Sequence, residues 1–92
     1  MKDFDWFKSE FEVYLEKYDV EYRFFEEGDF GSLHQVEFNT KEKGGEIDFW
    51  SLGWLNIHFV DYKEGKELIN ILLDSHQKIE KEALFKKLQE LL

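Results

Sequence analysis

The chain has 92 residues, which is enough for one domain spanning residues 1–92 but leaves little material for a deep cleft beside the core. Its net charge is −9, from 21 acidic and 12 basic residues, and its longest cationic cluster is the pair Lys86 and Lys87, which argues against binding to nucleic acid or to an anionic membrane. The chain has no cysteine and no apolar run as long as a signal peptide or a membrane helix needs, so we expect a cytoplasmic protein.

The first predicted element is an amphipathic helix at the start of the chain. Its apolar residues recur at three- and four-residue steps with charged residues between them, namely Phe4, Phe7, Phe11, Leu15 and Tyr18. Asp3 or Asp5 is expected to cap this helix, because a carboxylate can accept hydrogen bonds from the free N–H groups of the first turn.

From Asp19 the apolar residues recur at every second position, which predicts β-strands. The alternating stretches are residues 20–24, 34–40, 47–50 and 54–60. Between them lie a loop at residues 26–32, a polar turn at residues 41–45 that includes Gly44 and Gly45, and a turn at Leu52 and Gly53. Such short, glycine-containing connections predict an antiparallel meander.

Residues 63–73 allow two interpretations. Residues 63–65 resemble a hairpin loop with Gly65 in the left-handed conformation, and a fifth strand would then carry Ile69, Ile71 and Leu73. In a helix, one face would instead carry Leu68, Ile69, Leu72 and Leu73. We favour the strand.

The last predicted element is a helix capped by Asp74 and Ser75. Its expected buried stripe is Ile79, Ala83, Leu84, Leu88 and Leu91. Because both helices are apolar on one side, we expect them to cover the same face of the sheet. The predicted fold is an α+β two-layer sandwich: an N-terminal helix, an antiparallel four- or five-stranded meander sheet and a C-terminal helix.

Strand alternation divides the strand residues between two faces. The face expected under the helices carries Val20, Tyr22, Phe24, Val36, Phe38, Ile47, Phe49, Leu55, Ile57 and Phe59. The other face carries Glu21, Arg23, Gln35, Glu37, Asp48, Trp50, Trp54, Asn56, His58 and Tyr62. Aromatic side chains among acids are typical of a binding surface. Alternatively, these aromatic residues only stabilise the sheet by cross-strand pairing, or residues 64–73 fold over them.

The sequence gives no positive sign of catalysis or of a metal site. His34, His58 and His76 are scattered and do not have the spacing of metal ligands. A carboxylate pair such as Glu37 and Asp48 is expected by chance in so acidic a chain. Catalysis would require a deep pocket in which His58 and Asp48 converge. We therefore expect neither an enzyme nor a cofactor.

Three stretches share a rhythm of glycine and tryptophan in a strand–turn–strand pattern: residues 31–38, 44–50 and 53–58. In this pattern about a third of the chain resembles small bacterial immunity proteins of toxin/immunity systems, such as contact-dependent inhibition. The resemblance implies a cytosolic inhibitor that binds a toxin domain, often a basic nuclease. It assigns no site residue.

The leading hypothesis is that the acidic, aromatic sheet face occludes a basic toxin domain. The residues expected to bind this partner are Asp48, Trp50, Trp54 and His58, with Glu37 and Tyr62 at the rim. The alternative is a self-associating structural or regulatory module with no toxin partner. In that case the tryptophan-bearing face or an open sheet edge would form a homodimer.

Overall fold

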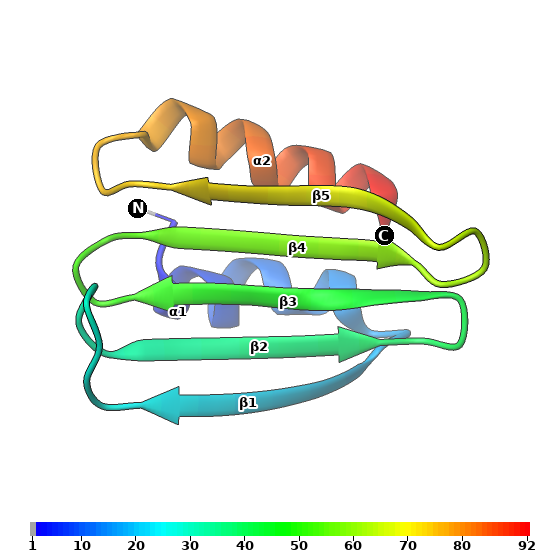
Figure 1. The fold of residues 1–92 in the computed structure, drawn as a ribbon, viewed down its shortest axis with the longest axis horizontal. Coiled ribbons are helices and arrows are strands. Elements are labelled where there is room, and N and C mark those ends of the chain that lie inside the picture. The colour runs from blue at the N-terminus through cyan, green and yellow to red at the C-terminus, as the bar shows by residue number, and fades with distance from the viewer. Residues whose placement is uncertain (1) are drawn as a thin grey trace.

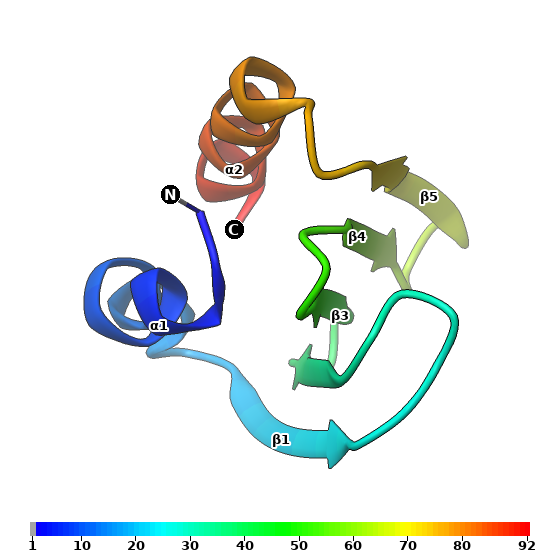
Figure 2. The same ribbon diagram turned by 90° about the vertical axis from the view of Figure 1, so that its left-hand side faces the viewer.

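The alternating segments form consecutive antiparallel strands. Within residues 2–92, which the computed structural model describes, the strands are β1 (Asp19–Phe25), β2 (Leu33–Asn39), β3 (Lys43–Trp50), β4 (Leu55–Asp61) and β5 (Lys66–Leu73). Each strand pairs with the next, so the sheet order is β1-β2-β3-β4-β5 (Figure 1). The helices from both ends of the chain lie on the same side of the sheet (Figure 2). The predicted α+β fold is thus confirmed, with five strands.

The N-terminal helical segment covers residues 4–15 and changes type along its length. α1 (Phe4–Trp6) begins at Asp3, whose side chain accepts a hydrogen bond from the Trp6 backbone N–H at 2.9 Å. Asp3, not Asp5, is therefore the cap. A π-helical section, η1 (Phe7–Phe11), and a 3-10 section, η2 (Glu12–Leu15), follow. The buried residues keep a four-residue spacing through both sections: Phe7, Phe11 and Leu15.

β5 settles the ambiguous region in favour of a strand. Gly65 has φ +62°, so it takes the left-handed conformation expected in the loop before β5. Phe59 pairs with Ile69 but Val60 pairs with Glu67, so Leu68 is an extra residue in a bulge. β5 therefore extends the sheet and does not fold over either face.

The turn between β2 and β3 is shorter than predicted, because Gly44 and Gly45 belong to β3. In the register, Gly45 lies between Phe38 on β2 and Phe59 on β4, whose ring centroids are 5.5 Å apart. A Cβ at Gly45 would clash with the backbone of His58. These glycines therefore allow a close approach of neighbouring groups within a strand; they do not form the turn itself.

α2 (Lys78–Leu91) starts later than predicted, and its predicted stripe is confirmed at Leu84 and Leu88, with Leu91 partly buried against the core. The residue that precedes it is Gln77, so the predicted cap at Asp74 and Ser75 is wrong; Asp74 instead accepts a bond from the His76 N–H at 2.8 Å. The buried residues are Leu84, Phe85 and Leu88, whereas Ile79 is 83% exposed and Ala83 is also exposed. Within residues 2–92, no helix is long and apolar enough to cross a membrane.

The core lies between the helices and the inner strands. The predicted covered face is buried over β2, β3 and β4, where every apolar residue assigned to it has 5% exposure or less. β1 is the exception, because it lies at the sheet edge (Figure 1), where the N-terminal helical segment covers it only in part, through contacts such as Phe4 with Tyr22. Tyr22 and Phe24 point to the helix side but remain 41% and 53% exposed.

Candidate functional site

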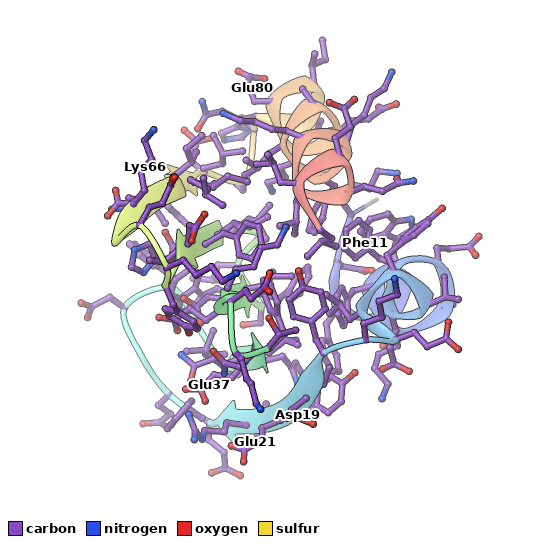
Figure 3. All side chains as sticks on the ribbon, turned by 90° about the vertical axis from the view of Figure 1, so that its right-hand side faces the viewer. Phe11, Asp19, Glu21, Glu37, Lys66 and Glu80 are labelled. Carbon is purple, nitrogen blue, oxygen red and sulfur yellow. The ribbon has the colours of Figure 1, made fainter. Side chains whose placement is uncertain are left out.

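The candidate site is the side of the sheet that faces away from the helices, which we call the open face. All six predicted binding residues lie on it or at its border: Glu37, Asp48, Trp50, Trp54, His58 and Tyr62. The antiparallel register arranges its side chains in rows that run across the strands. Figure 3 shows Glu21 and Glu37 on this side and Phe11 on the helix side.

One row brings three glutamates of neighbouring strands together. Glu21 on β1 pairs with Glu37 on β2, and Glu37 pairs with Glu46 on β3. Directly opposite side chains have Cβ atoms about 4.5–5.5 Å apart, and like charges in such positions are destabilising. We call these three residues the carboxylate row. Arg23 forms ion pairs with Glu37 and, at 3.2 Å, with Glu21, so it compensates one end of the row.

The other end of the row is held by neutral amides. The Gln35 side-chain amide donates to Glu46 Oε2 at 2.7 Å and to Asp48 Oδ1 at 2.9 Å. The Asn56 amide donates to Asp48 Oδ2 at 3.2 Å. Asp48 is only 6% exposed. Among residues 2–92, neither Glu46 nor Asp48 forms an ion pair with a cation.

The position of Glu46 is electrostatically unfavourable for a carboxylate. Burial raises the pKa of its carboxyl group, and the charges of Asp48 and Glu37 raise this pKa further, against a smaller opposite effect of His58. Within residues 2–92, the guanidinium of Arg23 lies on the open face among six strand carboxylates: Asp19, Glu21, Glu37, Glu46, Asp48 and Glu67. A cation placed against Glu46 would relieve this repulsion.

His58 lies next to Glu46 in the register but its ring nitrogen contacts β5. Nε2 is 3.3 Å from Glu67 Oε2; the His58 side chain is partly exposed and that of Glu67 is exposed. His58 and Asp48 therefore have separate partners on the open face and do not converge in a pocket.

An aromatic cluster closes one end of the open face. The loop at residues 26–32 lies over this end (Figure 2). There the Phe30 ring stacks on Trp54 with a centroid distance of 4.2 Å and meets Trp50 edge-on at 5.5 Å. The loop is fixed to the β3–β4 turn by a bond from the Ser51 N–H to the Ser32 carbonyl at 2.8 Å. We call Phe30, Trp50 and Trp54 the aromatic cap. Both tryptophans are only partly exposed.

Tyr62 borders the opposite end of the open face. Its hydroxyl donates to the Asn39 side-chain oxygen and lies where a Cβ of Gly44 would be. Tyr62 therefore shields the bare backbone of Gly44, which gives it a structural role at this border.

A cavity of about 540 Å³ lies between the first residues of the chain, the start of α2 and the β3–β4 turn, and Trp50 and Trp54 of the candidate site contribute to its lining. Its charged lining is balanced: Lys2, Lys78 and Lys81 against Asp3, Asp5 and Glu82. Neither Asp48 nor His58 lines it. The pair of residues that a catalytic hypothesis would have used therefore lies outside this cavity.

Sequence reasoning missed two residues of this site, Glu46 and Phe30. Glu46 follows the glycines assigned to a turn, although the alternation Gly44, Glu46, Asp48 would have placed it on the open face. Phe30 lies in a loop, and no local pattern indicates that its ring reaches Trp54. Comparisons with protein-family models, with curated proteins and with solved structures found no match to this chain.

Proposed function

We propose that this chain is an immunity-type binding protein that neutralises a basic toxin domain by occluding it with the open face. The observation that carries the proposal is the pair Glu46, in the carboxylate row, and Asp48, two residues further along β3. Both accept hydrogen bonds from side-chain amides, and neither forms an ion pair with a cation within residues 2–92. A lysine or arginine of a partner would supply the missing charge.

The charge of the whole chain supports the same kind of partner. A net charge of −9 attracts a cationic protein over a distance of about a Debye length, about 8 Å at physiological salt. Complementary charge also accelerates encounter, up to about 10⁸–10⁹ M⁻¹s⁻¹ at low salt. Toxin nucleases hold phosphate groups and are cationic at their active sites, so an acidic face can take the place of the nucleic acid.

The aromatic cap supplies the apolar contacts that give an interface its affinity. Interfaces gain most of their affinity from a few anchors, and tryptophan is prominent among them. Trp50 and Trp54 lie at the end of the same face as the carboxylate row, while Glu26, Glu27 and Asp29 in the adjacent loop extend the acidic surface. Acids around an aromatic anchor form the polar rim that such interfaces require.

The experiment begins with capture of the partner. The chain is immobilised, incubated with lysate of its own source cells at low and at moderate salt, and the retained protein is identified and purified. We expect a basic protein whose retention decreases as salt rises, since exposed charge pairs are screened. Co-expression of this chain should then relieve the growth defect that the captured protein causes.

The site is tested with a pair of matched double variants. The open-face variant E37Q/E46Q and the control E80Q/E90Q each change the net charge from −9 to −7, but Glu80 and Glu90 are exposed on α2, and Glu80 points away from the sheet (Figure 3). We expect the first variant alone to weaken binding by about 30-fold or more, because loss of a desolvated charge contact costs about 2 kcal/mol or more. Equal weakening by both variants would show bulk attraction only and would refute the assigned face.

A further inference from the structure

The two edges of the sheet differ in how they are protected against pairing with another strand. The β5 edge has a bulge at Leu68 and begins with Lys66, both of which hinder edge pairing. β1 is seven residues long, has an unbroken register with β2, and contains neither proline nor lysine across Asp19–Phe25. Its aromatic residues are exposed: Tyr22 by 41%, Phe24 by 53% and Phe25 by 48%.

We propose that β1 pairs with β1 of a second copy of this chain, in antiparallel orientation about a twofold axis through Tyr22. With this axis, residue 21 of each copy lies opposite residue 23 of the other copy. Glu21 and Arg23 therefore form two equivalent cross-strand pairs. On the helix side, Val20 faces Phe24 in the same reciprocal way. The strand is thus complementary to itself in charge and in apolar character.

The register follows from charge and from the faces of the sheet. Directly opposite residues of an antiparallel pair lie on the same side of the sheet. If the open faces of the two copies are to stay continuous, the twofold axis must therefore pass through a residue, and the pairing of the two β1 strands can change only in steps of two residues. An axis through position 21 puts Glu21 opposite its own copy, and an axis through position 23 does the same for Arg23. Only the axis through Tyr22 makes Glu21 and Arg23 face each other.

A groove beside β1 receives the apolar side chain that this register delivers. It lies between the N-terminal helical segment and β1, is open to solvent with a volume of about 570 Å³, and is lined by Val13, Leu15, Val20 and Tyr22 together with the polar residues Lys8, Ser9, Glu12 and Glu16. Phe24 of the second copy stands opposite Val20, at this groove. Val13 is 67% exposed in the single chain, so both the groove wall and the entering ring would lose water contact.

The dimer extends the function proposed for the open face; the two share Glu21 of the carboxylate row and its partner Arg23, while Glu46, Asp48 and the aromatic cap take no part in the pairing. Pairing through β1 joins two sheets edge to edge and leaves both carboxylate rows and both aromatic caps on the same side. The occupant of the edge is a second copy, because the match of Glu21 with Arg23 is reciprocal.

The test measures the mass of the full chain by sedimentation equilibrium from low micromolar to near-millimolar concentration. We expect a dimer for the unmodified chain, and about tenfold weaker dimerisation for E21R and for R23E, because each turns two attractive cross-strand pairs into repulsive ones. Mixing the E21R chain with the R23E chain in equal amounts should restore a dimer as tight as that of the unmodified chain.

Two further variants separate this edge from general surface stickiness. F24D places a carboxylate beside Glu12 and Glu16 in the groove of the second copy and should abolish the dimer, whereas I79D changes a residue 83% exposed on α2 and should leave it intact. Circular dichroism confirms that each variant folds. A chain that stays monomeric at every concentration, or a mixture of E21R and R23E that associates no better than either alone, would overturn the proposal.

Discussion

Glu37 and Glu46 lie directly opposite each other on β2 and β3, so two carboxylates occupy one cross-strand position on the open face. Burial raises the pKa of the Glu46 carboxyl group above its ordinary value of 4.5, and the negative charges of Asp48 and Glu37 raise it further. The folded chain therefore holds the Glu46 proton more tightly than the unfolded chain does. This stabilising contribution is complete below the unfolded pKa and is lost as pH rises through the folded pKa. At neutral pH the ionised Glu46 weakens the fold.

We therefore expect Glu46→Gln to stabilise the chain at pH 7. The neutral amide removes the repulsion from Glu37 and Asp48 and can still take part in the hydrogen bonds around Gln35. Relieving a like-charge pair is worth about 0.2–1 kcal/mol, which corresponds to a rise in Tm of a few degrees in a domain of this size. The gain should disappear below about pH 4, where Glu46 is protonated in both states.

Thermal unfolding at a series of pH values checks this, with Glu80→Gln on α2 as the control of equal charge. The control should shift Tm by much less at pH 7. A lower Tm for Glu46→Gln than for the unmodified chain at pH 7 would mean that the amide bonds to Glu46 outweigh the repulsion. If the open face binds a cationic partner, the same stabilising variant should bind it more weakly, since a function-bearing carboxylate is retained at the expense of stability.

The architecture could be predicted because its signals are local. The period-two pattern of Val36, Phe38, Ile47 and Phe49 fixes which side of each strand is buried, and the structure buries all four. The same alternation placed Asp48 and Trp50 on the opposite side. Strand assignment and face assignment thus follow from the positions of side chains along one strand.

The corrections concern contacts between residues distant in sequence. Gly44 and Gly45 were assigned to a turn because glycine is typical there, whereas their role in β3 depends on Tyr62 and on the backbone of His58. Phe30 reaches Trp54 across 24 positions of sequence. The exposure of Tyr22 depends on how far the helices extend over the sheet. None of these relations leaves a periodic signal in the sequence.

The two glycines of β3 should respond differently to a methyl group. A Cβ at Gly45 meets only backbone atoms, those of His58 and Phe59, so the strands would have to separate. We expect Gly45→Ala to cost about 1–3 kcal/mol by overpacking. At Gly44 a Cβ meets the side-chain ends of Asn39 and Tyr62 beside one backbone atom, the Phe38 carbonyl oxygen. Alanine also restricts the unfolded chain, which stabilises the fold by about 0.4–1 kcal/mol.

Urea unfolding of Gly44→Ala and Gly45→Ala should therefore give a larger loss of stability for Gly45. Adding Tyr62→Ala to Gly44→Ala should lessen the cost of the glycine substitution, because the hydroxyl that the methyl group meets is gone. Equal losses for both glycines would contradict the different surroundings described for them.

The buried stripe of α2 gives a second comparison within one element. The centroid of the Phe85 ring lies 4.8 Å from that of Trp6 and 5.2 Å from that of Phe11, and Phe85 is 2% exposed. Phe85→Ala should cost about 3–5 kcal/mol, through lost burial and a cavity. Ile79→Ala, at a residue 83% exposed, should change stability by no more than about 0.5 kcal/mol. A large loss for Ile79→Ala would show that this residue is covered in solution.

The aromatic cap predicts that Phe30 controls the exposure of both tryptophans. Replacing it with alanine removes the ring stacked on Trp54 and the edge contact with Trp50, each worth about 0.5–1.5 kcal/mol. The loop at residues 26–32 should then lift from the open face.

Tryptophan fluorescence measures this exposure in a Trp6→Phe background, where Trp50 and Trp54 are the remaining tryptophans. We expect Phe30→Ala to shift the emission to longer wavelength and to increase its quenching by acrylamide. Ile79→Ala, at a residue 83% exposed on α2, should change neither signal. If the partner binds through Trp50 and Trp54, Phe30→Ala should also alter its affinity, whereas unchanged emission would mean that the loop does not depend on this ring.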